Sequence, residues 1–226
     1  MDTSWLYWIY PAFFALVAAG VIGSFYQEKR RREALAKAAL RLGCTFAPRA
    51  DELTSEYGGL PLFSRGHSRR ATNVLRGGGG DRPDAAFDYR YTIGSGKSST
   101  TYRQTVAVFR LTGAALPAFT MAPEHMLHRL GELFGYRDID FEHQEGFSRA
   151  YFLRGKDEAA VRRLFQPALP AFFQQEQGWS VEGGAEQLVV YRAGQRAKPE
   201  DLQRFMDTAV RMAGLFKSGE FRGASG

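Results

Sequence analysis

The sequence predicts an α+β protein in which a single N-terminal transmembrane helix continues into a cytoplasmic domain. Three observations lead to this expectation: an uncharged opening stretch, grouped runs of alternating apolar and polar residues typical of strands, and segments of helical spacing between those groups. We therefore expect an antiparallel, or mixed, sheet packed against several helices. The predicted parts are a short external N-terminus (1–4), a transmembrane helix (5–26), a basic juxtamembrane helix (27–43), a cytoplasmic domain (44–216) and a flexible C-terminal tail (217–226).

The opening stretch carries the strongest signal. Residues 3–27 are 25 residues without a formal charge, and as a helix they would extend roughly 37 Å, more than the hydrocarbon core of about 30 Å. Aromatic residues gather at both ends, where amphipathic rings would meet the two membrane interfaces. They are Trp5, Tyr7, Trp8 and Tyr10 at one end and Phe25 and Tyr26 at the other. The alternative, a buried core helix, would usually be shorter.

Charge sets the expected orientation of this segment. All 30 Lys and Arg residues follow position 27, which favours an external N-terminus and a cytoplasmic remainder. A cleaved signal peptide would need a basic N-terminal region, whereas the only charged residue there is Asp2. The predicted location is therefore the cell membrane (plasma or inner), with one span.

A basic cluster follows the predicted span directly, with Lys29, Arg30, Arg31 and Arg32. Residues 28–50 carry seven basic and two acidic side chains, so they account for most of the net charge of +6. Anionic headgroups attract such clusters by about 1 kcal/mol per residue, and we expect the lipid bilayer to be a partner here. The simpler alternative is a topology signal without lipid specificity. A nucleic-acid partner is not expected, because the rest of the chain is nearly balanced and carries no known nucleic-acid-binding motif.

The first half of the domain is predicted to be rich in strands. Helical spacing over residues 28–42 ends at Gly43, a left-handed terminator. In residues 87–93 and 105–111 apolar and polar side chains alternate, which predicts antiparallel strands with one face in water. The remaining predicted elements are a strand at 44–46, a helix at 50–57, strands beginning at 60–63 and including 71–75, 85–93, 102–111 and 117–121, and a helix at 124–134.

The second half of the sequence is predicted to contain alternating strands and helices. Asp157 is expected to cap a helix, and residues 179–181 and 187–192 are expected to pair across a turn at Gly183 and Gly184. The predicted elements are a strand at 150–153, helices at 157–165 and 168–175, the strands just named, and a final amphipathic helix from Pro199 to Phe216.

Composition and motif argue against several kinds of functional site. A single cysteine, Cys44, rules out a disulfide scaffold and a CxxC redox motif, and its position predicts a small buried hydrophobe. Residues 94–98 read Gly-Ser-Gly-Lys-Ser, but Tyr91 stands where a phosphate-binding loop needs its first glycine and a strand follows, so we expect a hairpin tip. The surroundings of Ser148 miss the nucleophile-elbow pattern at Ala150.

One cluster has the residue types of a metal site. His125 and His128 lie three apart on a predicted helix and so share a face, and alternating acidic residues follow. Imidazole and carboxylate groups suit zinc, manganese or iron, although the spacing matches no established motif. The alternative is a solvated helix face followed by an edge strand. The candidate ligands are His125, His128, Asp138, Asp140 and His143.

Two functional interpretations follow from the sequence. The favoured one is a membrane-anchored, non-catalytic binding or scaffold module with a protein partner and no cofactor, because no complete catalytic set is visible. The alternative is a membrane-bound, hydrolase-like enzyme that uses one divalent transition metal at the His125 to His143 cluster.

Overall fold

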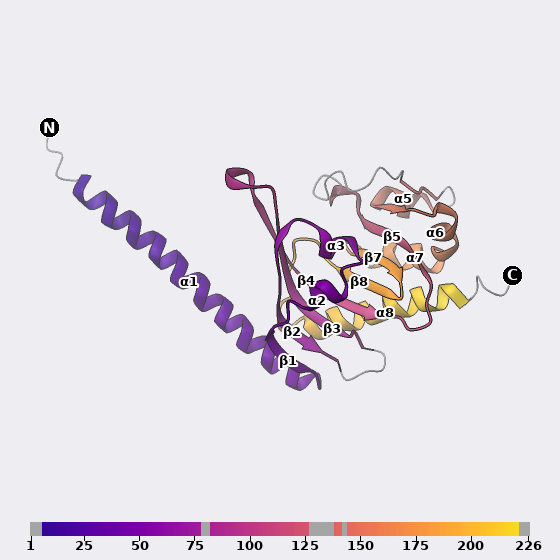
Figure 1. Cartoon of the computed structure of the whole chain (residues 1–226), viewed down its shortest axis with the longest axis horizontal. Coiled ribbons are helices and arrows are strands. Elements are labelled where there is room, and N and C mark those ends of the chain that lie inside the picture. The colour runs from indigo at the N-terminus through magenta and orange to yellow at the C-terminus, as the bar shows by residue number, and fades with distance from the viewer. Residues whose placement is uncertain (1–5, 78–81, 127–137, 142–143, 222–226) are drawn as a thin grey trace.

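The computed structural model describes residues 6–77, 82–126, 138–141 and 144–221, with only the backbone path for 6–9, 11–12 and 219–221. Its centre is an 8-stranded sheet with the order β1-β2-β3-β4-β8-β7-β5-β6, in which neighbouring strands pair antiparallel. Helix α1 projects away from the body formed by the sheet and the other helices (Figure 1). The predicted α+β class and the antiparallel sheet are confirmed.

The strands are β1 (Thr45–Arg49), β2 (His67–Arg76), β3 (Ala85–Ile93), β4 (Thr100–Arg110), β5 (Leu116–Pro123), β6 (Tyr151–Gly155), β7 (Ser180–Ala185) and β8 (Gln187–Tyr191). The helices are α1 (Leu6–Arg41), α2 (Leu53–Glu56), α3 (Pro61–Ser64), α5 (Glu145–Ala150), α6 (Glu158–Leu164), α7 (Ala168–Gln175) and α8 (Leu202–Phe221), with 3₁₀ turns η1 (Gly96–Ser98) and η2 (Glu124–Met126). Helix α8 continues past residue 216, where the last helix was expected to end.

Helices cover both faces of the sheet. Ala86 of β3 belongs to a core cluster with Leu35 of α1 and Phe216 of α8, whereas its neighbour Phe87 packs in a second cluster with Phe63 of α3. Successive strand residues point to opposite faces, so the centre of the sheet is buried on both sides. The prediction of strands with one wet face is therefore only partly right: Arg90 and Arg110 are exposed, but Asp88 and Thr105 are buried.

Two local predictions fail for identifiable reasons. Residues 61–64 form helix α3 rather than a strand, with Pro61 in the first turn, where its fixed φ suits a helix start. The β7–β8 turn lies at residues 185–186 instead of at the glycine pair, which is inside the strand pairing. Gly183 is needed there because a Cβ would overlap the ring of Phe119 on the neighbouring strand.

The end of α1 follows the predicted pattern. Gly43 has a left-handed φ of 63°, and the amide of Cys44 donates to the carbonyl of Ala39 at 2.9 Å, which is the hydrogen bond of a Schellman ending. The guanidinium of Arg82 donates to the carbonyl of Leu42. The chain therefore leaves α1 sharply and enters β1 at the sheet edge.

A buried carboxylate fixes the C-terminal part of α1 to the sheet. Asp88 of β3 is 5% exposed and accepts hydrogen bonds from Arg31 Nε and Nη2 at 2.7 and 2.8 Å. Asn73 of β2 and the hydroxyl of Thr105 of β4 donate to the same carboxylate at 3.0 and 2.9 Å. Four donors thus compensate for the loss of water around this charge.

The opposite face holds a second buried carboxylate, Glu182 of β7. It is fully buried and accepts hydrogen bonds from Arg65 at 3.0 Å, from the Leu62 amide at 2.6 Å and from the Tyr191 hydroxyl at 2.9 Å. Burial, together with the neighbouring Glu182 charge, raises the pKa of Tyr191 well above its ordinary value. This cluster attaches α3 to the middle of the sheet.

The prediction of a transmembrane helix over 5–26 is wrong on this structure. Within the described residues, no helix has an apolar run long enough to cross a membrane. The segment is helical, as the first part of α1 (Leu6–Arg41). The single span, the orientation and the cell-membrane location inferred from it are corrected with it.

Replacing the Asp88 carboxylate should show how much the fold depends on it. We expect Asp88→Ala to lower the free energy of unfolding by about 3–5 kcal/mol, because the Arg31 side chain, only 13% exposed, is left without a counter-charge. Urea unfolding of the full chain in a mild detergent measures this. Glu158→Ala, which removes an exposed ion pair to Arg162, is the control and should cost less than about 1 kcal/mol. Equal losses for the two variants would contradict a structural role for the buried pair.

Candidate functional site

The predicted metal cluster is only partly within the described residues. His128 and His143 lie outside them, so a ligand role for these two stays a prediction. Among the residues that are described, no group of three or more His, Cys, Asp or Glu side chains could hold a metal ion. His125 is exposed in η2 and lines a cavity of about 540 Å³ with Glu124, Arg149 and Tyr151.

Asp138 has a structural role that the sequence did not suggest. Its Oδ1 accepts hydrogen bonds from the amides of Ile139 at 3.0 Å and Leu153 at 2.8 Å, and the Ile139 amide also donates to the Leu153 carbonyl. Leu153 lies in β6, an edge strand, so residues 138–139 cover an edge that would otherwise be open to pairing. Burial raises the pKa of Asp138 despite these donors. Asp140 is exposed, and its backbone carbonyl accepts from Arg162.

The other residues considered for catalysis are in structural positions. Cys44 is buried, as predicted. The Ser148 hydroxyl accepts a hydrogen bond from the Phe141 amide at 2.9 Å. The Gly-Ser-Gly-Lys-Ser segment forms the connection between β3 and β4, with η1 at its tip, which confirms the predicted hairpin.

The most unusual surface of the molecule is on α1. Nine large apolar or aromatic side chains, which we call the exposed apolar stretch, are 48–74% exposed. They are Tyr10, Phe13, Phe14, Leu16, Val17, Val21, Ile22, Phe25 and Tyr26. Leaving such area in water costs about 25 cal/mol per Å², and continuous apolar patches of this kind mark interaction sites.

Basic side chains follow the exposed apolar stretch, but they divide into two groups. Lys29, Arg30 and Arg32 are exposed, and the guanidinium of Arg30 lies 4.6 Å from the centre of the Tyr26 ring. Arg31 points the other way and binds Asp88. Only three of the four predicted headgroup contacts therefore face solvent.

The second part of α1 attaches the exposed apolar stretch to the domain. Leu35, Ala38 and Ala39 are buried in the core cluster shared with α8. Glu28 forms an ion pair of 2.6 Å with Arg196, in the loop before α8. Because packing and ion pairs from two elements fix the base of α1, the exposed apolar stretch leaves the body in one direction (Figure 1).

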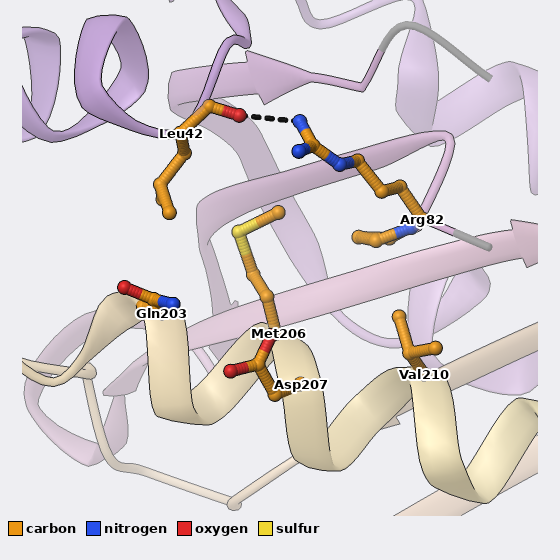
Figure 2. Close-up of a pocket in the computed structure, with 7 residues that line it drawn as sticks. Leu42, Arg82, Gln203, Met206, Asp207 and Val210 are labelled. Carbon is orange, nitrogen blue, oxygen red and sulfur yellow. Dashed lines mark hydrogen bonds between the residues drawn. The ribbon is translucent and has the colours of Figure 1, made fainter. Parts of the chain in front are cut away.

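A cleft of about 420 Å³ lies where the end of α1 approaches α8. Figure 2 shows Gln203, Met206, Asp207 and Val210 projecting from α8 below Leu42 and Arg82, with the hydrogen bond from Arg82 to the Leu42 carbonyl above Met206. Its walls are mainly apolar, so it could accept an apolar group. Its one carboxylate, Asp207, does not form a catalytic set with the other lining residues.

Comparison with known proteins shows a similarity in fold to a solved structure. No family model matches the chain, and no curated protein matches its sequence. The crystal structure of the mycobacterial trehalose monomycolate transport factor A, TtfA, has a similar fold, with a TM-score of 0.59 over 84% of this chain and 92% of that chain. The sequence identity is 12%, so the similarity concerns the fold alone.

Asp138 gives a test that separates support of the sheet edge from metal binding. We expect Asp138→Ala to lower the free energy of unfolding by about 1–3 kcal/mol, because the buried Leu153 amide loses its acceptor. Asp138→Asn keeps an oxygen at the same place and should recover most of this loss, and Asp140→Ala should change stability by less than about 0.5 kcal/mol. Urea unfolding with and without a chelator measures all three. A loss that appears only when metal is present would contradict the structural role.

Proposed function

We propose that this protein is a non-catalytic, lipid-associated binding module. The observation that carries the proposal is the exposed apolar stretch of α1, which packs on nothing in the part of the chain that the structure describes. Nine large side chains held in water are costly unless another apolar phase or partner covers them. Lipid is the proposed contact of this stretch, because of the adjoining positive charge and the similarity in fold to TtfA.

The first reason is the charge next to the exposed apolar stretch. Lys29, Arg30 and Arg32 follow its last residue, Tyr26, after Gln27 and Glu28, and are exposed. Lipid-contacting helices commonly combine an apolar surface with Lys and Arg that meet anionic headgroups. A protein groove that covered a helix would not require cations at this position.

The second reason is the fold similarity. TtfA, which has a similar fold, is named as a transport factor for trehalose monomycolate, a lipid. This supports a lipid-related role by analogy of fold. A module held at a lipid surface would also present its sheet domain to partners at raised effective concentration.

A non-catalytic role agrees with the side chains considered for chemistry. Cys44 is buried, Ser148 accepts a backbone hydrogen bond, and Asp138 supports the edge of β6. The two histidines within the described residues, His67 and His125, belong to different elements, at the start of β2 and in η2. Among the described residues these groups form no nucleophile, base and orienting partner in one place.

Vesicle flotation tests the lipid contact. We expect the full chain, diluted from mild detergent, to float with phosphatidylcholine vesicles. The triple variant Leu16→Gln, Ile22→Gln, Phe25→Gln should have a partition coefficient at least about tenfold lower, because each side chain buried in lipid contributes roughly 1.5–3 kcal/mol. Adding phosphatidylglycerol should strengthen binding through Lys29, Arg30 and Arg32.

The matched control is Leu40→Gln, on the same helix beyond the exposed apolar stretch and 80% exposed. It should float like the original chain, and circular dichroism should show the same helix content in all variants. Flotation of the triple variant at the original level would refute lipid contact by this surface.

A further inference from the structure

A basic groove lies at the beginning of α8, on the side of the body where β7 starts and β8 ends. Its cavity volume is about 560 Å³. It is lined by residues from the loop between α7 and β7, the loop after β8 and the first three turns of α8.

The groove has more cations than its own carboxylates can neutralise. Five lining residues are Lys or Arg and two are acidic. Arg211 pairs with Glu176 at 2.9 Å, and Arg196 pairs with Glu28 of α1. Lys198 and Arg204 are exposed and form no ion pair with any described residue. These two cations are available to a ligand.

The first turn of α8 adds to this positive potential. The Phe205 amide donates to the Asp201 carbonyl at 2.9 Å as the first turn closes, and Arg204 lies within that turn. The amides at a helix N-terminus carry partial positive charge that favours anions. The Asp201 carboxylate neutralises part of this positive potential. The unpaired Lys198 and Arg204 therefore decide the sign of the net electrostatic potential in the groove.

The floor of the groove contains a buried indole without an acceptor. Trp179 is 2% exposed, packs on Phe205 with ring centres 5.2 Å apart, and lies under the guanidinium of Arg192 at 4.8 Å. Its Nε1 has no hydrogen-bond partner among the described residues. Indole N–H groups usually find a partner when buried, and a ligand in the groove would supply the missing acceptor.

We propose that this groove binds the phosphate group of a phosphorylated ligand. Phosphate suits the site because Arg guanidinium groups bind its oxygens in pairs and because its double charge matches two unpaired cations and a helix N-terminus. The volume exceeds that of one phosphate, which leaves room for an organic part over the apolar floor. The proposal does not depend on lipid contact by α1.

Two titrations of the full chain test this site and separate a free phosphate from a lipid headgroup. The first is calorimetry with inorganic phosphate, and the second is flotation with phosphatidylcholine vesicles with and without phosphatidic acid. The test variant is Lys198→Gln with Arg204→Gln. The control is Arg163→Gln with Lys217→Gln, which removes two exposed cations of α6 and α8 outside the groove.

We expect the test variant to lose at least tenfold in phosphate affinity while the control binds like the original chain. The site would be assigned to a lipid headgroup by a different pair of results. Free phosphate would not bind, and the extra flotation caused by phosphatidic acid would be lost in the test variant but not in the control. Equal behaviour of test and control variants in both titrations would overturn the proposal. Flotation on pure phosphatidylcholine reports on α1 separately, so failure of one proposal does not imply failure of the other.

Discussion

The carboxylate of Asp88 is the point on which the arrangement of the molecule depends. It joins α1 through Arg31, β2 through Asn73 and β4 through Thr105. The Thr105 hydroxyl also accepts from the amide of Ala197, in the loop that lines the groove. A charge removed from water is stable only with such a full set of donors. The direction of α1 and the position of the groove are therefore set by one network.

The division of α1 into two parts has a functional meaning. Burial of the sheet requires Leu35, Ala38 and Ala39, which pack against the core. It does not require the exposed apolar stretch, whose side chains stay 48% or more exposed. Because folding of the domain does not require these apolar side chains, we attribute them to a contact that the helix makes outside the chain. Lipid is the contact that the adjoining exposed cations favour.

The sequence predicts those features that depend on neighbouring residues. Gly43 ends α1, Asp157 caps α6 by accepting from the Ala160 amide, and the β3–β4 hairpin has its polar tip at the expected place. Features that depend on distant partners were missed. The sequence places Arg31 among the headgroup contacts because its partner is 57 residues away, and it predicts Asp88 as one polar position on a wet strand face. The groove was missed because its residues are spread from 176 to 211 and no local spacing connects them.

The same network makes the groove ready to bind without rearrangement. The Thr105 amide donates to the Gln195 carbonyl, and the Ala197 amide donates to the Thr105 hydroxyl, so both ends of the central loop segment are attached to β4. Arg196, between them, is held by Glu28. A loop already ordered adds little entropy cost on binding. A ligand can shift α1 only if its affinity differs between two alternative orientations of that helix. A loop that is attached at both ends holds the helix in one orientation. The groove and the exposed apolar stretch should therefore act as independent binding surfaces on a common frame.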